Sequence, residues 1–183
     1  GKVIEVLGLA QKAGLTREGV LRRCTACGQL LSSATEAQYL RSLGRFDTSA
    51  GTLPDARSQS RHDKNSSRRL SNLLAVLGRP SSTVCLLDVG CSSGAFLQSA
   101  LRLGFTAEGV EPSADAAQTA RAAGLKVFTG YLEQAQFPDA SFDAITLIEI
   151  VEHLRDARSL LQECARILKP GGVVLVTTPN ANS

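Results

Sequence analysis

The stretch from Val84 to Leu97 constrains the fold more than any other part of this 183-residue chain. Five of its first six residues are apolar, and Gly90 and Gly94 follow this run. An apolar run that ends in a glycine loop and continues as an amphipathic segment is typical of a buried parallel strand, a tight turn and a helix. In α/β proteins, cofactors bind at the carboxyl end of such a strand, beside the N-terminus of the helix.

The charge in this stretch indicates which kind of cofactor the loop accepts. Asp88 lies where the strand opens into the loop. Its carboxylate would repel a pyrophosphate and attract an ammonium or sulfonium ion. A dinucleotide fingerprint that starts at Gly90 needs glycine at position 92, which holds serine. S-adenosylmethionine carries both cations and no phosphate, so the residues favour it, and an NAD-linked Rossmann enzyme is the less favoured alternative.

The same residues resemble the first motif, D-x-G-x-G-x-G, of the class I (Rossmann-like) S-adenosylmethionine-dependent methyltransferases. Asp88, Gly90 and Gly94 match this motif, whereas Ser92 replaces its usual middle glycine. A small residue at that position still allows the backbone to approach a ligand closely. The resemblance implies that the cofactor is bound by Asp88, Gly90, Cys91, Ser92 and Gly94.

Two later segments extend the expected cofactor site. Residues 105–112 are predicted to form a second strand that ends in Glu111, at about the spacing where a carboxylate binds ribose hydroxyls. Methyltransferases and dinucleotide enzymes both have an acidic residue at this position. It therefore indicates that the ligand contains a ribose, but it does not distinguish between the two cofactors. The resemblance further implies that Tyr131 and Leu132 bind the adenine ring. The alternative is that Leu132 is part of the core.

The segment 149–154 carries a further group of candidate residues. If it forms one helical turn, Glu149, Glu152 and His153 share a face at i, i+3 and i+4. The segment resembles the Glu-x-x-Glu-His segment of ubiquinone-type O-methyltransferases and of small-RNA 2′-O-methyltransferases. In the RNA enzymes these residues bind a divalent metal together with a later histidine, and no histidine follows His153 in this sequence. Three roles stay open: binding of Mg²⁺, catalysis by His153 and Glu152 with His153 as general base, or a structural turn. Glu149 is also expected to contact the cofactor.

The front of the chain carries a motif of another kind. Cys24 and Cys27 form a Cys-x-x-Cys-Gly knuckle of the type found in zinc ribbons. It resembles the second knuckle of an N-terminal ribbon in some bacterial methyltransferases. Structural zinc requires four ligands, and the sequence holds no second pair. We therefore expect zinc at Cys24 and Cys27 only in a longer chain with an upstream pair, and otherwise two surface thiols.

Composition and patterning divide the chain into three parts. Residues 1–45 are predicted to form an N-terminal appendage, and residues 46–67, rich in Ser, Arg, Asp and Gly, a linker or lid. Residues 68–183 are the expected methyltransferase domain, which opens with an amphipathic helix at 68–78. Its predicted fold is α/β, with a doubly wound, mostly parallel sheet truncated after a fifth strand at 173–178. The family's C-terminal hairpin would be missing, and with no methionine anywhere we expect a fragment.

Charge and cysteine content bear on partners and location. Residues 1–79 hold 13 Lys and Arg against 6 Asp and Glu, so nucleic acid is not excluded as a partner. The sequence has no apolar run of membrane-spanning length and no recognisable signal peptide. Its five cysteines, an odd number, favour reduced thiols and a cytoplasmic setting. The predicted function is methyl transfer to a small-molecule or carrier-bound acceptor, and the alternative is a non-catalytic S-adenosylmethionine-binding fragment.

Overall fold

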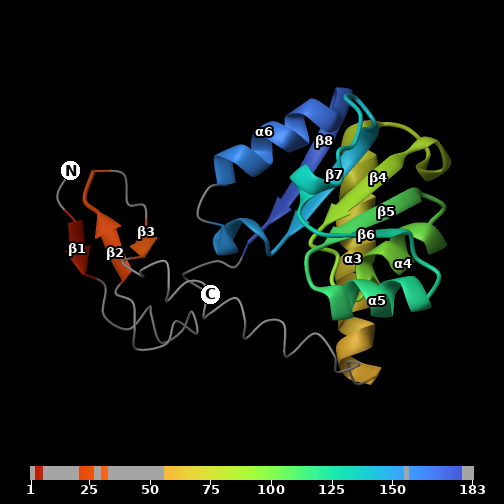
Figure 1. Cartoon of the computed structure of the whole chain (residues 1–183), viewed down its shortest axis with the longest axis horizontal. Coiled ribbons are helices and arrows are strands. Elements are labelled where there is room, and N and C mark those ends of the chain that lie inside the picture. Colours follow the sequence, from red (N-terminus) through yellow and green to blue (C-terminus); the bar gives the residue numbers. More distant parts are fainter. Residues whose placement is uncertain (1–2, 6–20, 27–29, 33–55, 155–156, 179–183) are drawn as a thin grey trace. The chain divides into compact units, whose positions relative to one another are not determined.

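The computed structural model describes residues 3–5, 21–26, 30–32, 56–154 and 157–178. The chain divides into two units, a small one within residues 1–48 and a larger one formed by residues 49–178. In the small unit, three short strands form an antiparallel sheet in the order β1-β2-β3 (Figure 1). They are β1 (Val3–Glu5), β2 (Leu21–Cys24) and β3 (Leu30–Ser32).

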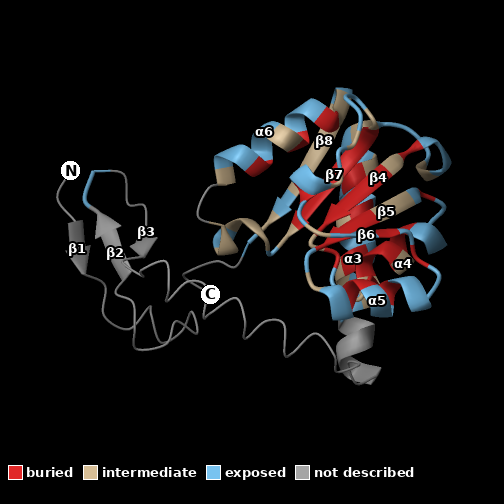
Figure 2. Cartoon of the chain, in the orientation of Figure 1, coloured by how far each residue is buried: buried red, intermediate tan, exposed pale blue. Residues whose placement is uncertain are grey.

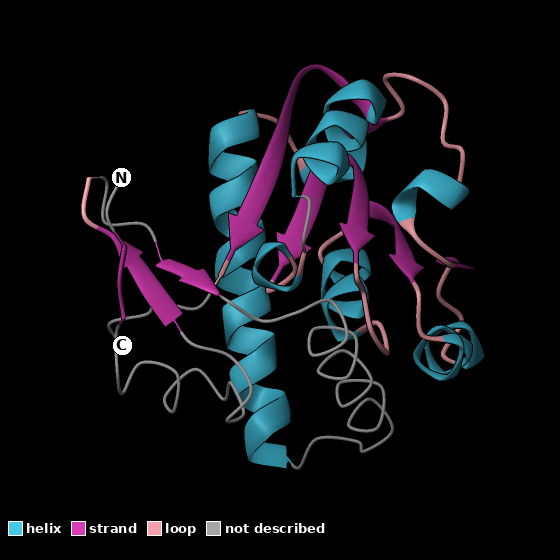
Figure 3. Ribbon diagram, turned by 60° about the vertical axis from the view of Figure 1, so that its left-hand side comes forward, coloured by secondary structure: helices cyan, strands magenta, loops and turns pink. Residues whose placement is uncertain are grey.

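A parallel sheet of five strands forms the centre of the larger unit (Figure 3). Its strands are β4 (Cys85–Val89), β5 (Thr106–Glu111), β6 (Val127–Thr129), β7 (Phe142–Ile148) and β8 (Leu168–Thr177). They lie in the order β6-β5-β4-β7-β8, so the chain winds outward from β4 in one direction and then from β7 in the other. This arrangement confirms the predicted doubly wound, Rossmann-like α/β fold. Its switch point lies between β4 and β7, where such sheets bind ligands at their carboxyl edge.

Helices cover both faces of this sheet. On one face pack α3 (Ala56–Leu77), α4 (Ala95–Arg102) and α5 (Ala114–Ala122), and on the other packs α6 (Ala157–Ile167). Neighbouring residues of a strand point to opposite faces. Leu86 therefore belongs to the core beneath α3 and α4, and Leu87 to the core beneath α6. Figure 2 shows the buried residues concentrated in the strands and on the inner sides of the helices. None of the helices in the described part of the chain is long and apolar enough to cross a membrane.

Two elements begin earlier than predicted. Helix α3 starts at Ala56 and not at residue 68, so it extends into the segment predicted as a linker or lid. The first half of α3 is polar, and the hydrophobic period that identifies a helix starts only near Leu70. Strand β8 starts at Leu168, which pairs with Phe142 before the strand bulges through the Lys-Pro-Gly-Gly turn and resumes its pairing at Val173.

Candidate cofactor-binding site

The loop from Gly90 to Gly94 connects β4 to α4 at the carboxyl edge of the sheet. Both glycines have positive φ angles, +73° and +86°. A Cβ atom added to Gly90 would lie 2.2 Å from Cδ1 of Ile150, and one added to Gly94 would lie 2.1 Å from Cδ1 of Leu125. A side chain at either position would have to displace the end of Ile150 or Leu125 and adopt a φ angle that L residues rarely adopt, so glycine is strongly favoured at both.

Ser92 occupies the position where the resembling motif has its middle glycine. Its φ angle is +50°, in the left-handed region that residues other than glycine seldom adopt. The backbone N–H of Ser92 donates a hydrogen bond of 2.8 Å to Oε2 of Glu111. This bond anchors a loop conformation that serine adopts less readily than glycine. The side chain of the neighbouring Cys91 is buried in the core beside α4, and this burial raises the pKa of its thiol. A ligand at the loop would therefore contact the backbone of Cys91 and not its side chain.

Glu111, at the end of β5, joins two loops at the carboxyl edge. Its Oε2 accepts from the N–H of Ser92, and its Oε1 accepts from the N–H of Ser113, each at 2.8 Å. Ser113 is also the N-cap of α5, since its Oγ accepts from the N–H of Ala116. A carboxylate has about four acceptor sites, so Glu111 can bind these two amides and still accept from ribose hydroxyls.

Asp88, the candidate partner for a cation, is 3% exposed at the carboxyl end of β4. Thr146 lies directly opposite on β7 and donates a hydrogen bond of 2.6 Å from its Oγ1 to Oδ1 of Asp88. Burial raises the pKa of Asp88 to about 7; the bond from Thr146 and the charge of Arg69 oppose this rise, and the charge of Glu111 adds to it. The site is thus a buried acid beside a second carboxylate, which favours a bound cation.

Sequence reasoning missed Arg69, which α3 brings to this edge. Its Nη2 lies 4.0 Å from Oε1 of Glu149, and its charge lowers the pKa of Asp88. Helix α3 runs antiparallel to β4, since Arg79, beyond its C-terminus, pairs with Asp143 at the start of β7. A signal was available in the sequence: Arg69 directly precedes the apolar stripe of the helix before the first strand.

The candidate residues after β7 are arranged differently from the expectation. The short 3₁₀ helix η3 comprises only Val151–His153. Glu149 precedes it with a φ angle of +57° and an exposed side chain, so Glu149, Glu152 and His153 do not share a face of one helical turn. Within the described residues, no three His, Cys, Asp or Glu side chains are grouped so as to hold a metal ion. Binding of Mg²⁺, catalysis by Glu152 and His153, and a structural role of this turn therefore all stay predictions.

The other predicted ligands fall into two groups. Leu132, in the 3₁₀ helix η2 (Leu132–Gln134), is a core residue beneath α6, whereas the side chain of Tyr131 is exposed. The N–H of Tyr131 donates a hydrogen bond of 2.7 Å to Oε1 of Gln134. An adenine contact here would therefore involve the Tyr131 ring or the backbone, and it stays a prediction. The predicted zinc ligands Cys27 and the side chain of Cys24 lie outside the described residues.

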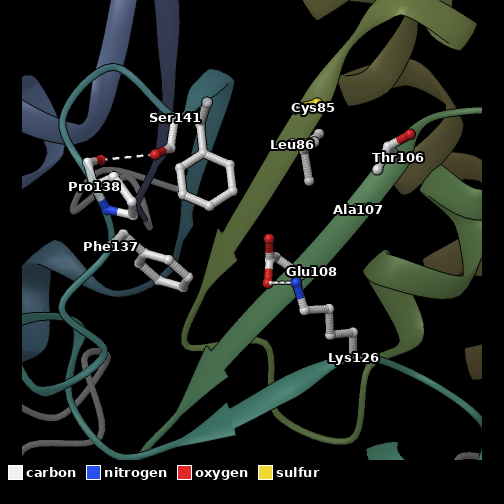
Figure 4. Close-up of a pocket in the computed structure, with 10 residues that line it drawn as sticks. Cys85, Leu86, Thr106, Ala107, Glu108, Lys126, Phe137, Pro138 and Ser141 are labelled. Atoms are coloured by element: carbon white, nitrogen blue, oxygen red, sulfur yellow. Dashed lines mark hydrogen bonds and ion pairs between the residues drawn. The ribbon is translucent and has the colours of Figure 1, made fainter.

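A pocket of about 300 Å³ opens at the opposite end of the strands (Figure 4). It is lined by the first residues of β4 and β5 and by the segment that leads into β7. At its wall, Nζ of Lys126 forms an ion pair of 2.7 Å with Oε2 of Glu108, and the rings of Phe137 and Phe142 meet edge to face. Because this pocket lies at the amino-terminal ends of the strands, it does not include Asp88 or the glycine loop.

Comparisons with known proteins bear on the chemistry of the site. A family model described as a methyltransferase domain matches residues 60–183. A ubiquinone biosynthesis O-methyltransferase from Alkalilimnicola ehrlichii is 34% identical over 149 residues, which cover 76% of this chain and 60% of that relative. The chain spans about half the length of the curated relatives that it matches.

Solved structures share the fold. A SAM-dependent methyltransferase from Archaeoglobus fulgidus superposes with a TM-score of 0.54 at 23% identity, over 65% of this chain and 53% of that one. The [4+2]-cyclase SpnF superposes with a TM-score of 0.51 at 26% identity, over 63% of this chain and 44% of that one. Because proteins named for different reactions share this fold, the chemistry has to be argued from the site residues.

Proposed function

This chain belongs to the class I S-adenosylmethionine-dependent methyltransferases, and on that premise we propose that it transfers the cofactor's methyl group to a hydroxyl of a small-molecule acceptor. The observation that carries this proposal is the buried carboxyl of Asp88 beside the glycine loop. A carboxylate at this place suits a ligand whose nearest part is cationic, and it disfavours a pyrophosphate. The site therefore fits S-adenosylmethionine better than NAD.

The residues around Asp88 fit the methionine end of the cofactor. The carboxyl of Asp88 supplies negative charge for the ammonium group, and Arg69 supplies positive charge for the cofactor's carboxylate. Gly90 and Gly94, both with positive φ, let the loop turn tightly between β4 and α4 directly after Asp88. These roles are inferred from charge and placement, and the proposal puts the methionine end at the carboxyl end of β4, beside the glycine loop and Arg69.

Glu111 is proposed to bind the ribose. Its two oxygens already accept hydrogen bonds from the loops after β4 and β5, and its remaining acceptor sites are proposed to bind the ribose hydroxyls. The ring of Tyr131, exposed after the neighbouring strand β6, is the proposed contact for the adenine.

The bound cofactor supplies a methyl group that its sulfonium has already activated. The protein then has to align the acceptor with that group and to exclude water. A hydroxyl acceptor also needs a group to take its proton. His153, half-buried in η3 directly after β7, is the proposed base. The acceptor class is proposed from the relatives named as O-methyltransferases of ubiquinone biosynthesis.

A second candidate function is binding of S-adenosylmethionine without turnover. The observation that favours it is the arrangement after β7, where Glu149, Glu152 and His153 do not share one face of a helical turn. Such a module would keep the cofactor contacts of β4 and β5 and take its acceptor site from elsewhere.

Methyl transfer can be measured directly. The chain is incubated with S-adenosylmethionine carrying a labelled methyl group and with a series of catechols, and we expect the label in an ether of the acceptor. The variant Asp88→Ala is the control, because it should remove transfer by removing cofactor binding. Cofactor binding without transfer to any catechol or to any other small-molecule hydroxyl would contradict the proposed reaction and support the binding module.

A further inference from the structure

The contact between Thr146 and Asp88 has a consequence for cofactor binding. The two residues face each other across the β4–β7 ladder, and the distance from Oγ1 to Oδ1 is 2.6 Å. Thr146 is fully buried and Asp88 is 3% exposed, so water does not replace this bond when it is lost. Among the described residues, Thr146 makes the only side-chain hydrogen bond to Asp88.

We propose that Thr146 is a positioning residue, which holds the carboxyl of Asp88 in the orientation that receives the ammonium group of the cofactor. This inference rests on the proposed function, since it assumes that Asp88 binds the methionine end. Thr146 itself lies beside Asp88 on the adjacent strand and acts on the cofactor only through that carboxyl.

The hydroxyl of Thr146 can pair with Asp88 in both protonation states. A hydroxyl has one proton to donate and can also accept. When Asp88 is ionised, Thr146 donates to its Oδ1. When Asp88 is protonated, the carboxyl donates to Oγ1, and the hydroxyl proton can turn to the carbonyl oxygen of Leu87, 3.4 Å away. Asp88 can therefore gain or lose its proton without leaving a buried polar group unpaired.

This arrangement links cofactor binding to pH. The charged groups that act on Asp88 from neighbouring elements are Glu111 on β5, which raises its pKa, and Arg69 on α3, which lowers it. With a pKa of about 7 in the free protein, Asp88 is largely protonated at pH 6, and a cationic ligand has to displace that proton. The affinity for a ligand with an ammonium group should therefore rise from pH 6 to pH 8, and its binding in this range should release a proton from Asp88.

Three variants test the role of Thr146. Thr146→Val keeps the shape and removes the hydrogen bond, whereas Thr146→Ser keeps the hydroxyl. Thr177→Val is the matched control: it makes the same chemical change on the adjacent strand β8, at a buried Oγ1 without a hydrogen-bond partner in the described residues. The dissociation constant for S-adenosylhomocysteine is measured by calorimetry from pH 5.5 to 8.5 for each protein, together with the melting temperature.

We expect Thr146→Val to weaken binding about tenfold at pH 7 and to move the midpoint of the pH dependence up by about one unit. Thr146→Ser and Thr177→Val should keep the midpoint of the unmodified chain. A purely structural role would lower the melting temperature of Thr146→Val and leave its midpoint unchanged, and that result would overturn the proposal. If Thr146→Val does not fold, Thr146→Cys repeats the test with a weaker hydrogen-bond donor of similar size.

The failure of this inference can be told apart from failure of the proposed function. If the unmodified chain binds S-adenosylhomocysteine and Thr146→Val has the same pH midpoint, only the role of Thr146 is wrong. If the unmodified chain does not bind it at any pH, the proposed function is wrong. In that case, NMR titration of the Asp88 carboxyl in both proteins still measures whether Thr146 controls its ionisation, and equal titration midpoints would reject the inference.

Discussion

Glu111→Ala is expected to weaken binding of S-adenosylhomocysteine about 100-fold. A hydrogen bond to a charged group contributes about 1.5–3 kcal/mol, and Glu111 is expected to make such bonds to the ribose. The substitution also leaves the N–H groups of Ser92 and Ser113 without their acceptor, so the glycine loop and the start of α5 lose a shared anchor. Calorimetric titration of both proteins at pH 8, where Asp88 is ionised, measures the difference.

Glu108→Ala is the matched control for this prediction. Glu108 lies on the same strand as Glu111, three residues before it, and its carboxylate pairs with the exposed Lys126. Surface ion pairs contribute about 0–1 kcal/mol, and this one is remote from the loop, so the affinity should stay unchanged. Equal losses in the two variants would show that β5 is only generally sensitive to substitution and that Glu111 has no specific role in binding.

Asp143→Ala is expected to lower the free energy of unfolding by about 2–4 kcal/mol at pH 7, because it removes a buried carboxylate that accepts a backbone hydrogen bond and charge-assisted bonds from two half-exposed cations. Asp143 is 2% exposed at the start of β7. Its carboxylate accepts from the N–H of Cys85 at 2.8 Å and pairs with Nη2 of Arg79 at 2.7 Å and Nζ of Lys169 at 3.1 Å. One side chain thus connects β4, β7, β8 and the segment after α3. Urea unfolding of both proteins gives the difference.

The effect of Asp143→Ala should depend on pH in a defined direction. Burial raises the pKa of Asp143, but the bonds from Cys85, Arg79 and Lys169 outweigh it and hold the pKa below its ordinary value. The stabilisation is therefore complete above the pKa of the unfolded chain, about 3.9, and is lost as the pH falls through the lower pKa of the folded state. The difference between the two proteins should be large at pH 7 and shrink below pH 4.

Asp139→Ala provides the control at the same end of the sheet. Asp139 is mostly exposed and pairs with Arg166, which also binds Glu163. The substitution should cost less than about 1 kcal/mol. If Asp139→Ala and Asp143→Ala lower the free energy of unfolding by the same amount, burial of Asp143 is not the reason for its effect.

The local part of the site could be predicted from the sequence, because it depends on neighbouring residues. The apolar run before Asp88 and the spacing of Gly90 and Gly94 indicate the strand, the loop and the helix together. Glu111 could be found in the same way, since it ends the next predicted strand. Predicting these features does not require the order of the strands in the sheet, so the hydrophobic periodicity and the turn residues are enough to locate them.

The remaining features depend on tertiary structure. Thr146 reaches Asp88 only because β7 pairs with β4 in one particular register. The residues of β7 alone do not indicate which register the two strands adopt. Arg69 reaches the site through the direction of α3. The left-handed conformation of Glu149 separates it from η3, and a glutamate gives no local signal for this conformation.

Direct titration with two ligands tests most sharply whether this carboxyl edge is an S-adenosylmethionine site. The chain is titrated by calorimetry at pH 8 with S-adenosylhomocysteine and, separately, with NAD⁺. We expect one molecule of S-adenosylhomocysteine per chain and an affinity at least about tenfold higher than for NAD⁺, because the ionised Asp88 attracts an ammonium and repels a pyrophosphate. Tighter binding of NAD⁺ would contradict the assignment of the site.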